Sequence, residues 1–278
     1  MSSGIYVVLQ NHKHIRQIHP ENAILEQTQK NAQQLRFHIY IMSIKSRFTL
    51  RQPVDIQCVD IAGHQALIID DFLEQPEVLL QIAAQSQFEI YPGVAQQKGY
   101  PGIRAQAPED YSQVLTEFLE PVMRQFFAIP EELGLRKSIC AFSLTTTPAA
   151  ELGPLQRTPH FDASTPHHMA VLLYLCDEKH GGTGFYRHNA TGLQQINADN
   201  RERYLDVYYE EINARRPAQR YFDDSSAEFT FLGMIPAKFN RLVIYHGSLL
   251  HSACINPAIS LSSNPLQGRL TLNSFFDF

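Results

Sequence analysis

The hydrophobic and polar positions between residues 66 and 127 predict one strand and two helices. Ala66 to Phe72 is an apolar run that ends in acidic residues, as expected of a strand. Pro76 precedes the first helical stripe, and proline suits a helix start because its missing N–H costs no hydrogen bond there. A second helix is predicted from about Asp110 to Phe127, and we interpret it as core structure without chemistry. Its apolar residues follow the i, i+3, i+4, i+7 pattern: Leu115, Phe118, Leu119, Val122, Met123 and Phe126.

After residue 138 the pattern changes to short apolar runs separated by turn residues such as Gly181-Gly182 and Asn256-Pro257. One charged helix, from about Ala198 to Arg216, interrupts the series. Many short strands with turn signals favour a sandwich or jelly roll. The predicted fold class is therefore α+β: a double-stranded β-helix (jelly roll) with N-terminal helices packed on one sheet. The predicted strands are Ile139–Thr145, Arg157–Asp162, His168–Cys176, Gly184–Arg187, Glu228–Leu232, Arg241–Tyr245, Leu249–Ile255 and Leu270–Phe276.

Residues 1–57 differ from the rest, because they are rich in Gln, Asn, His and Lys and show little periodicity. We interpret them as an N-terminal extension to a single jelly-roll domain of residues 58–278. Met42 is a plausible alternative start, so residues 1–41 are predicted to be dispensable. The alternative is an N-terminal strand and helix that pack on the domain.

Composition limits the classes of function. The chain has 278 residues, of which 44% are hydrophobic, and a net charge of −5, so no general basic surface points to nucleic acid. No run approaches the ~18 consecutive apolar residues of a membrane span. The short apolar run Ile5 to Leu9 lacks a preceding basic segment, which argues against a secretory signal. The four cysteines lie far apart, as expected of reduced thiols in a cytoplasmic protein: Cys58, Cys140, Cys176 and Cys254.

His160-Phe161-Asp162, followed later by His251, matches a metal-binding pattern. Alternate residues of a strand point to one face, so His160 and Asp162 would aim together and Phe161 away. Two imidazoles and one carboxylate form the facial triad of non-haem Fe(II) oxygenases, which leaves positions open for a co-substrate and dioxygen. His160, Asp162 and His251 are therefore the predicted metal ligands and catalytic residues.

Five motifs in order resemble the prolyl-4-hydroxylase-type oxygenases that depend on Fe(II) and 2-oxoglutarate. After His160-Phe161-Asp162 come Val171-Leu172-Leu173-Tyr174-Leu175 and Gly181-Gly182-Thr183-Gly184-Phe185, and then Leu250-His251-Ser252 and Gly268-Arg269-Leu270-Thr271. Each motif alone is weak, and the ordered set is fairly specific. More narrowly, Tyr91-Pro92-Gly93, Tyr100 to Arg104 and the C-terminal segments are similar to a bacterial family of uncharacterised oxygenase-like proteins.

The resemblance implies a dioxygenase that hydroxylates a C–H bond of an amino acid, peptide or small metabolite. Fe(II), 2-oxoglutarate and dioxygen would be its cofactor and co-substrates. The far carboxylate of 2-oxoglutarate needs a buried cation, and Arg269 offers a bidentate fork for it. Thr271, on the same strand face, and Tyr174 would complete this subsite. Arg104, Arg187 and His188 are candidate substrate contacts.

Two departures from the family pattern leave alternatives open. His246 and His251 are five residues apart, and His251 is preferred as the distal ligand because the residues after it resemble the family's sequence. Arg269 follows His251 by 18 positions, longer than the family's usual spacing, so residues 256–267 are interpreted as an inserted loop.

Other functions use the same residues. A cupin-like metalloenzyme would not need 2-oxoglutarate, and a non-catalytic jelly-roll module would keep the metal for stability or sensing. A hydrolytic zinc site is disfavoured because the chain has no HExxH motif. We expect a small-molecule or peptide substrate, no nucleic acid and no membrane, and the sequence predicts no oligomeric state.

Overall fold

A computed structural model of the chain describes residues 6–11, 14–16, 23–29, 35–41, 47–90 and 99–278. Met42 and the Tyr91-Pro92-Gly93 motif lie outside the described residues. The helices are α1 (Glu77–Gln85), α2 (Glu109–Phe126) and α3 (Arg201–Ala214). The strands before α2 are β1 (Tyr6–Asn11), β2 (His14–Arg16), β3 (Ala23–Gln29), β4 (Leu35–Ile41), β5 (Val54–Ile61), β6 (His64–Ile69), β7 (Glu89–Ile90) and β8 (Gly102–Gln106). Those after it are β9 (Lys137–Thr145), β10 (His168–Tyr174), β11 (Gly182–His188), β12 (Phe229–Pro236), β13 (Arg241–His246), β14 (His251–Cys254) and β15 (Arg269–Asp277).

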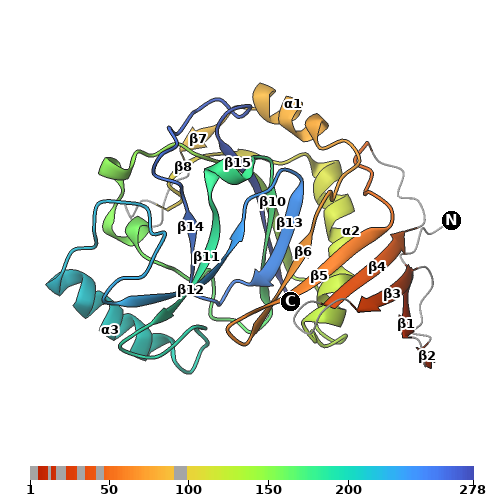
Figure 1. The fold of residues 1–278 in the computed structure, drawn as a ribbon, viewed down its shortest axis with the longest axis horizontal. Helices are drawn as coiled ribbons and strands as arrows, with labels where there is room; N and C mark the ends of the chain where they lie inside the picture. The colour runs from red at the N-terminus through yellow and green to blue at the C-terminus, as the bar shows by residue number, and fades with distance from the viewer. Residues whose placement is uncertain (1–5, 12–13, 17–22, 30–34, 42–46, 91–98) are drawn as a thin grey trace.

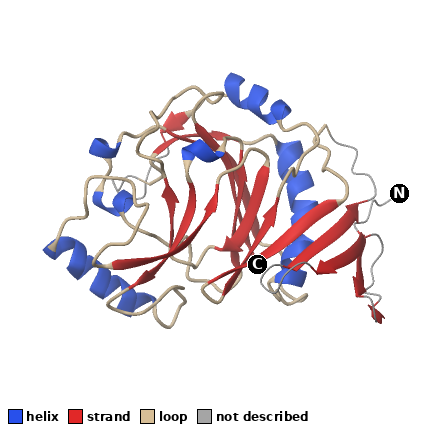
Figure 2. Cartoon of the chain, viewed as in Figure 1, coloured by secondary structure: helices blue, strands red, loops and turns tan. Residues whose placement is uncertain are grey.

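In the described part of the chain these strands form two sheets that are mostly antiparallel. The large sheet has the order β2-β1-β3-β4-β5-β6-β13-β10-β15-β9-β8-β7, and the small sheet has the order β12-β11-β14. Figure 2 shows strands through the centre of the molecule and helices around it. The fold is α+β, as the hydrophobic pattern predicts.

The central strand β10 shows how the two faces of the large sheet differ. Met169, Val171 and Leu173 point to a core that includes residues of α1 and α2. The alternate residues, Ala170, Leu172 and Tyr174, point to a second core shared with the small sheet. Because side chains alternate along a strand, one apolar run covers both faces. The large sheet is thus the middle layer, between α1 and α2 and the small sheet (Figure 1).

The predicted helices are confirmed. The helix α2 is shifted by one residue at each end from the predicted 110–127, and its apolar stripe is buried. The charged segment forms α3, which buries Tyr204, Tyr208 and Ile212 against the outer side of the small sheet and leaves Tyr209 exposed. In the described part of the chain, no helix combines the length and apolar character needed to cross a bilayer.

One predicted strand, residues 157–162, is wrong. A 3₁₀ turn occupies Pro154–Arg157, and the only pairing of the segment that follows, within the described residues, is a single bridge between His160 and His251. Pro159 lacks the N–H that a ladder requires, which explains why no strand extends through it.

The core reaches further toward the N-terminus than the predicted domain start at residue 58. Phe48, Leu50, Val54 and Ile56 are buried in the same core as α2. The strand β4 also pairs antiparallel with β5. The dispensability of residues 1–41 stays a prediction.

Candidate metal centre

Backbone hydrogen bonds hold the candidate ligands at the junction of three segments. The N–H of His160 donates to the carbonyl of His251, and the N–H of His251 donates to that of His160, each over 2.8 Å. The N–H of Asp162 donates to the carbonyl of Gly247 over 2.7 Å. These bonds join segments that are far apart in the chain, and they set the spacing of the ligands before any metal binds.

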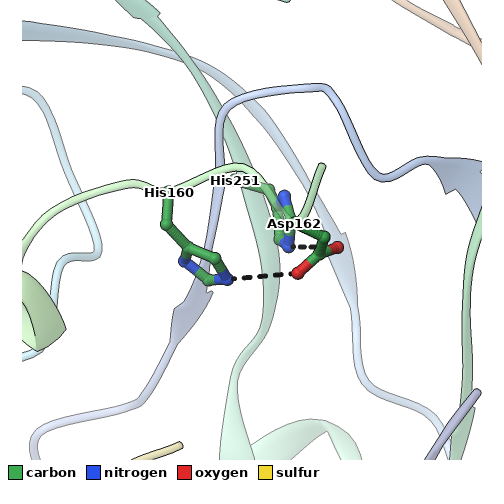
Figure 3. A group of neighbouring side chains, drawn as sticks. All are labelled: His160, Asp162 and His251. Atoms are coloured by element: carbon green, nitrogen blue, oxygen red, sulfur yellow. Dashed lines mark ion pairs between the residues drawn. The ribbon is translucent and has the colours of Figure 1, made fainter. Parts of the chain in front are cut away.

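The three side chains converge (Figure 3). Nε2 of His160 lies 3.8 Å from Oδ1 of Asp162, and Nε2 of His251 lies 3.6 Å from Oδ2. One possible ligand atom from each residue falls within 4.8 Å of the others. Donors that bind one ion at ~2.1 Å each stand at most ~4.2 Å apart. The set therefore fits a single ion after small side-chain movements.

The protonation states suit metal binding. Nδ1 of His251 bonds to the carbonyl of Leu249 over 2.8 Å, which assigns the proton to Nδ1 and leaves the Nε2 lone pair for an ion. Burial lowers the pKa of His251 to about 4, so its imidazole is neutral at pH 7. Burial and the neighbouring His251 also lower the pKa of His160, although 54% of its side-chain surface is exposed. Burial raises the pKa of Asp162.

The absence of a side chain at Gly247 makes room for this arrangement. A Cβ at this position would stand 2.6 Å from Cδ2 of His168 and 3.1 Å from Oδ2 of Asp162. The ring of His168 stacks on Phe275, and its Nδ1 is 3.4 Å from Oδ1 of Asp277. Gly247 and His168 thus confine the Asp162 carboxylate from one side, a contact that the sequence pattern did not reveal.

The triad opens into a cavity of about 570 Å³ whose wall also includes Arg269. The Arg269 side chain is almost fully buried, with 2% of the residue exposed. It donates from Nη2 to the carbonyl of Gly182 over 3.0 Å, and its buried Nε has no partner. Among the described residues, no carboxylate pairs with it. A buried unpaired charge is costly, so this position indicates an anion in the cavity.

Tyr174 and Thr271 lie beside this arginine but behind the cavity wall. The guanidinium carbon of Arg269 is 5.8 Å from the centre of the Tyr174 ring. The Tyr174 hydroxyl bonds to Oγ1 of Thr183 over 2.5 Å, and Thr271 donates to Oδ1 of Asn273 over 2.6 Å. Burial raises the pKa of Tyr174 to about 12, so its hydroxyl stays protonated. Thr183 and Asn273 are the partners that face the cavity.

Most of the chain matches the profile of one protein family. This is a family of unknown function, DUF6445, and the match covers residues 51–276. The chain belongs to this family. No curated protein matches the DUF6445 chain.

Two solved structures resemble this DUF6445 protein weakly. One is HygX from Streptomyces hygroscopicus, with nickel, 2-oxoglutarate and hygromycin B bound. It is 13% identical, with 76% of this chain and 81% of that chain covered and a TM-score of 0.40. The other is an N-substituted L-amino acid dioxygenase from Burkholderia ambifaria AMMD. It is 12% identical, with 76% and 80% covered and a TM-score of 0.30. Similarity this low leaves the chemistry of the site to be argued from its own residues.

The structure brings only some of the other predicted residues of the DUF6445 protein to the cavity. Arg104 lines it, with its guanidinium carbon 4.7 Å from the centre of the Tyr100 ring. Arg187 is exposed and lies outside the cavity wall. His188 is fully buried elsewhere and bonds through Nε2 to Glu211 over 2.7 Å.

The two candidate distal histidines of the DUF6445 protein occupy different surroundings. The ring of His246 packs edge-on against Phe127 at 5.1 Å and is absent from the cavity wall. His251 stands beside Asp162, at the start of β14. The arrangement can therefore hold one divalent ion through His160, Asp162 and His251, next to a buried cationic subsite.

Proposed function

We propose that this member of DUF6445 is an Fe(II)- and 2-oxoglutarate-dependent dioxygenase that hydroxylates a C–H bond of an amino acid, peptide or small metabolite. The observation that carries the proposal is a single cavity lined by both a two-histidine, one-aspartate triad and a buried, unpaired arginine. The metal ligands and the anion subsite of such an enzyme must lie within one cavity, because 2-oxoglutarate contacts both.

The donor set fits Fe(II). His160, Asp162 and His251 would hold the ion, and three protein ligands leave positions for co-substrate and dioxygen. The bound ion would supply the reaction with dioxygen, in which 2-oxoglutarate yields succinate and CO₂ and one oxygen atom enters the substrate C–H bond. The protein's own contribution is to hold and orient the partners.

The residues around Arg269 fit the co-substrate. The Arg269 guanidinium would bind the far carboxylate of 2-oxoglutarate, and that carboxylate would balance its buried positive charge. Thr183 and Asn273 line the same cavity and offer polar side-chain atoms, while Tyr174 and Thr271 hold them in place through hydrogen bonds. Leu172, Tyr245 and Phe275 supply apolar wall that excludes water.

We also propose a fold type and a cellular location for the enzyme. We interpret the two packed sheets as a double-stranded β-helix with the triad at one end of the small sheet. We also propose a cytoplasmic location, based on four widely spaced cysteines that are free thiols. The cupin-like and non-catalytic alternatives are less favoured, because 2-oxoglutarate gives the buried charge of Arg269 a specific partner, whereas a cupin-like enzyme would use Arg269 for structure or for its substrate.

Anaerobic titration of the metal-free protein with Fe(II) and then 2-oxoglutarate tests the proposal. We expect a weak visible charge-transfer band in the wild type and none in Asp162→Ala. Arg269→Ala should weaken 2-oxoglutarate binding by roughly 10- to 100-fold, because a charge-assisted hydrogen-bonded pair contributes ~1.5–3 kcal/mol.

Arg187→Ala is the matched control, because it removes an exposed arginine outside the cavity. Its band should equal that of the wild type. Bound iron without any band in the wild type would reject chelation of 2-oxoglutarate and return the alternatives to consideration.

A further inference from the structure

A second cavity, of about 450 Å³, lies between the C-terminal end of α3 and the loop that precedes β12. Figure 1 places α3 beside β12, at the edge of the molecule away from α1 and α2. The charged residues in its wall are Arg157, Arg215, Arg216, Arg220, Glu211 and Glu228. In a protein with a net charge of −5, four arginines around one cavity form a local basic site.

The acidic residues near this cavity have partners of their own, but Glu211 and Glu228 keep their charges, so the wall carries four arginines against two glutamates. Glu211 bonds to Nε2 of His188 over 2.7 Å, and Glu228 accepts a hydrogen bond from Ser226 over 2.9 Å. Asp223 pairs with Arg220. The remaining arginines, Arg157, Arg215 and Arg216, have no carboxylate partner among the described residues.

Hydrogen bonds to backbone carbonyls fix the Arg157 side chain but use only some of its N–H donors. It donates from Nε and Nη2 to the carbonyl of Leu152, over 2.9 and 2.6 Å, and from Nη1 to the carbonyl of Pro217 over 3.2 Å. A guanidinium has five N–H groups, so donors remain for a ligand. The backbone contacts orient the side chain, and they leave its positive charge unbalanced.

The cavity adjoins the metal centre. Thr158 lines both cavities, so they meet at this residue, and its hydroxyl bonds over 2.5 Å to that of Tyr208, which lines the second cavity. His160 follows Arg157 by three residues, which places their Cα atoms at most about 11 Å apart. A molecule that reaches the metal would have to pass Thr158 to extend to the arginines.

We propose that the arginine-lined cavity binds a phosphate group of the substrate whose C–H bond is oxidised at the metal centre. This substrate class rests on the proposed dioxygenase function, whereas the anion site itself does not. Phosphate is favoured over carboxylate because it carries up to two charges at neutral pH and three acceptor oxygens, which suit an excess of two arginines over glutamates in the wall.

Calorimetric titration of the metal-free protein with inorganic phosphate is the first test. Arg215→Ala/Arg216→Ala should bind phosphate at least about tenfold more weakly, through the loss of two charge-assisted contacts. Both arginines are exposed, so the melting temperature should stay near that of the wild type.

Arg201→Ala/Arg203→Ala is the matched control, because it removes two arginines from the other end of α3, outside the cavity. It should bind phosphate as the wild type does. Equal binding by both double variants, or no binding by the wild type, overturns the anion site. Equal binding of acetate and phosphate overturns the choice of phosphate.

The second test links the two cavities. With one equivalent of Mn(II) in the triad, the ³¹P relaxation of bound phosphate should be enhanced by the nearby ion, and Asp162→Ala should remove the effect. Phosphate that binds at the arginines without this relaxation, in a protein shown to hold Mn(II), overturns the substrate assignment. Failure of the triad to bind any metal contradicts the dioxygenase proposal instead, and the calorimetric result still stands.

Discussion

Gly247 stands between β13 and β14, directly against two side chains of the metal centre. Its carbonyl accepts the N–H of Asp162, and its missing side chain leaves space for the Asp162 carboxylate and the His168 ring. We therefore expect the absence of a side chain at Gly247 to favour metal binding, although Gly247 is not itself a candidate ligand. The effect belongs to the residue scale, because one methyl group is enough to remove it.

Gly247→Ala should lower metal affinity by about 10- to 100-fold, the range found when a group that orients a ligand is disturbed. The added methyl would meet His168 at 2.6 Å and Asp162 at 3.1 Å, so one of them must move. Calorimetric titration with Mn(II) measures the change. Gly134→Ala is the control, because a Cβ there meets nothing within 4 Å. Unchanged affinity in Gly247→Ala would show that the Asp162 carboxylate tolerates displacement.

At the scale of elements, Asp70 joins the end of β6 to β13. It accepts hydrogen bonds from Nε and Nη2 of Arg241, over 2.6 and 3.0 Å, and from Nζ of Lys238 over 3.0 Å. Burial alone would raise the pKa of Asp70, but the hydrogen bonds and charges of Arg241 and Lys238 prevail and lower it. β6 and β13 are paired strands that carry buried core residues, so this ion pair links two neighbouring strands near the middle of the large sheet.

The sign of the pKa shift predicts an acid-sensitive contribution. The folded pKa of Asp70 lies below the unfolded value of about 3.9, so its stabilisation is complete above that pH and is lost as pH falls through the folded pKa. Asp70→Asn should lower the free energy of unfolding at pH 7 by about 1–3 kcal/mol. The difference from the wild type should shrink toward pH 3.

Urea unfolding at pH 7, 4 and 3 measures this difference. Asp71→Asn is the matched control, since Asp71 is the exposed neighbour and asparagine tolerates its positive φ of 52°. A constant difference between Asp70→Asn and the wild type at all three pH values would contradict the assignment.

At the scale of the whole molecule, the N-terminal strands extend the large sheet away from the metal centre. No described residue before position 99 lines the metal cavity. For the described residues before Met42, contacts with the domain include the pairing of β4 with β5 and the edge-on contact of Phe37 with Phe126 at 4.9 Å.

A chain that starts at Met42 should therefore bind metal with the affinity of the full chain. If residues 1–41 are dispensable, as the sequence predicts, the melting temperature will also stay within a few degrees. A large fall in melting temperature with unchanged metal affinity would mean that β4 protects the edge of β5. Metal titration and thermal unfolding of both chains distinguish these results, and weakened metal binding would contradict the separation of the extension from the site.

Local sequence patterns predict much of the secondary structure of this protein and part of its candidate site. The 3.6-residue stripe of residues 115–126 predicts α2, because the burial of a helix face depends on spacing along the chain. The sequence also indicates His160 and Asp162 as a ligand pair, but through strand alternation, and the structure has no strand in this segment. Pro159 is itself a local signal against that strand, because proline cannot donate to a ladder.

Contacts between distant segments were decided only by the tertiary structure. The sequence prefers His251 to His246 only by resemblance to the family, and strand pairing places His251 beside Asp162 while His246 packs on Phe127. The isolation of Arg269 and the space at Gly247 are likewise absent from any local pattern. Each depends on which side chains from other strands come near, and residue spacing within one segment carries no information about those neighbours.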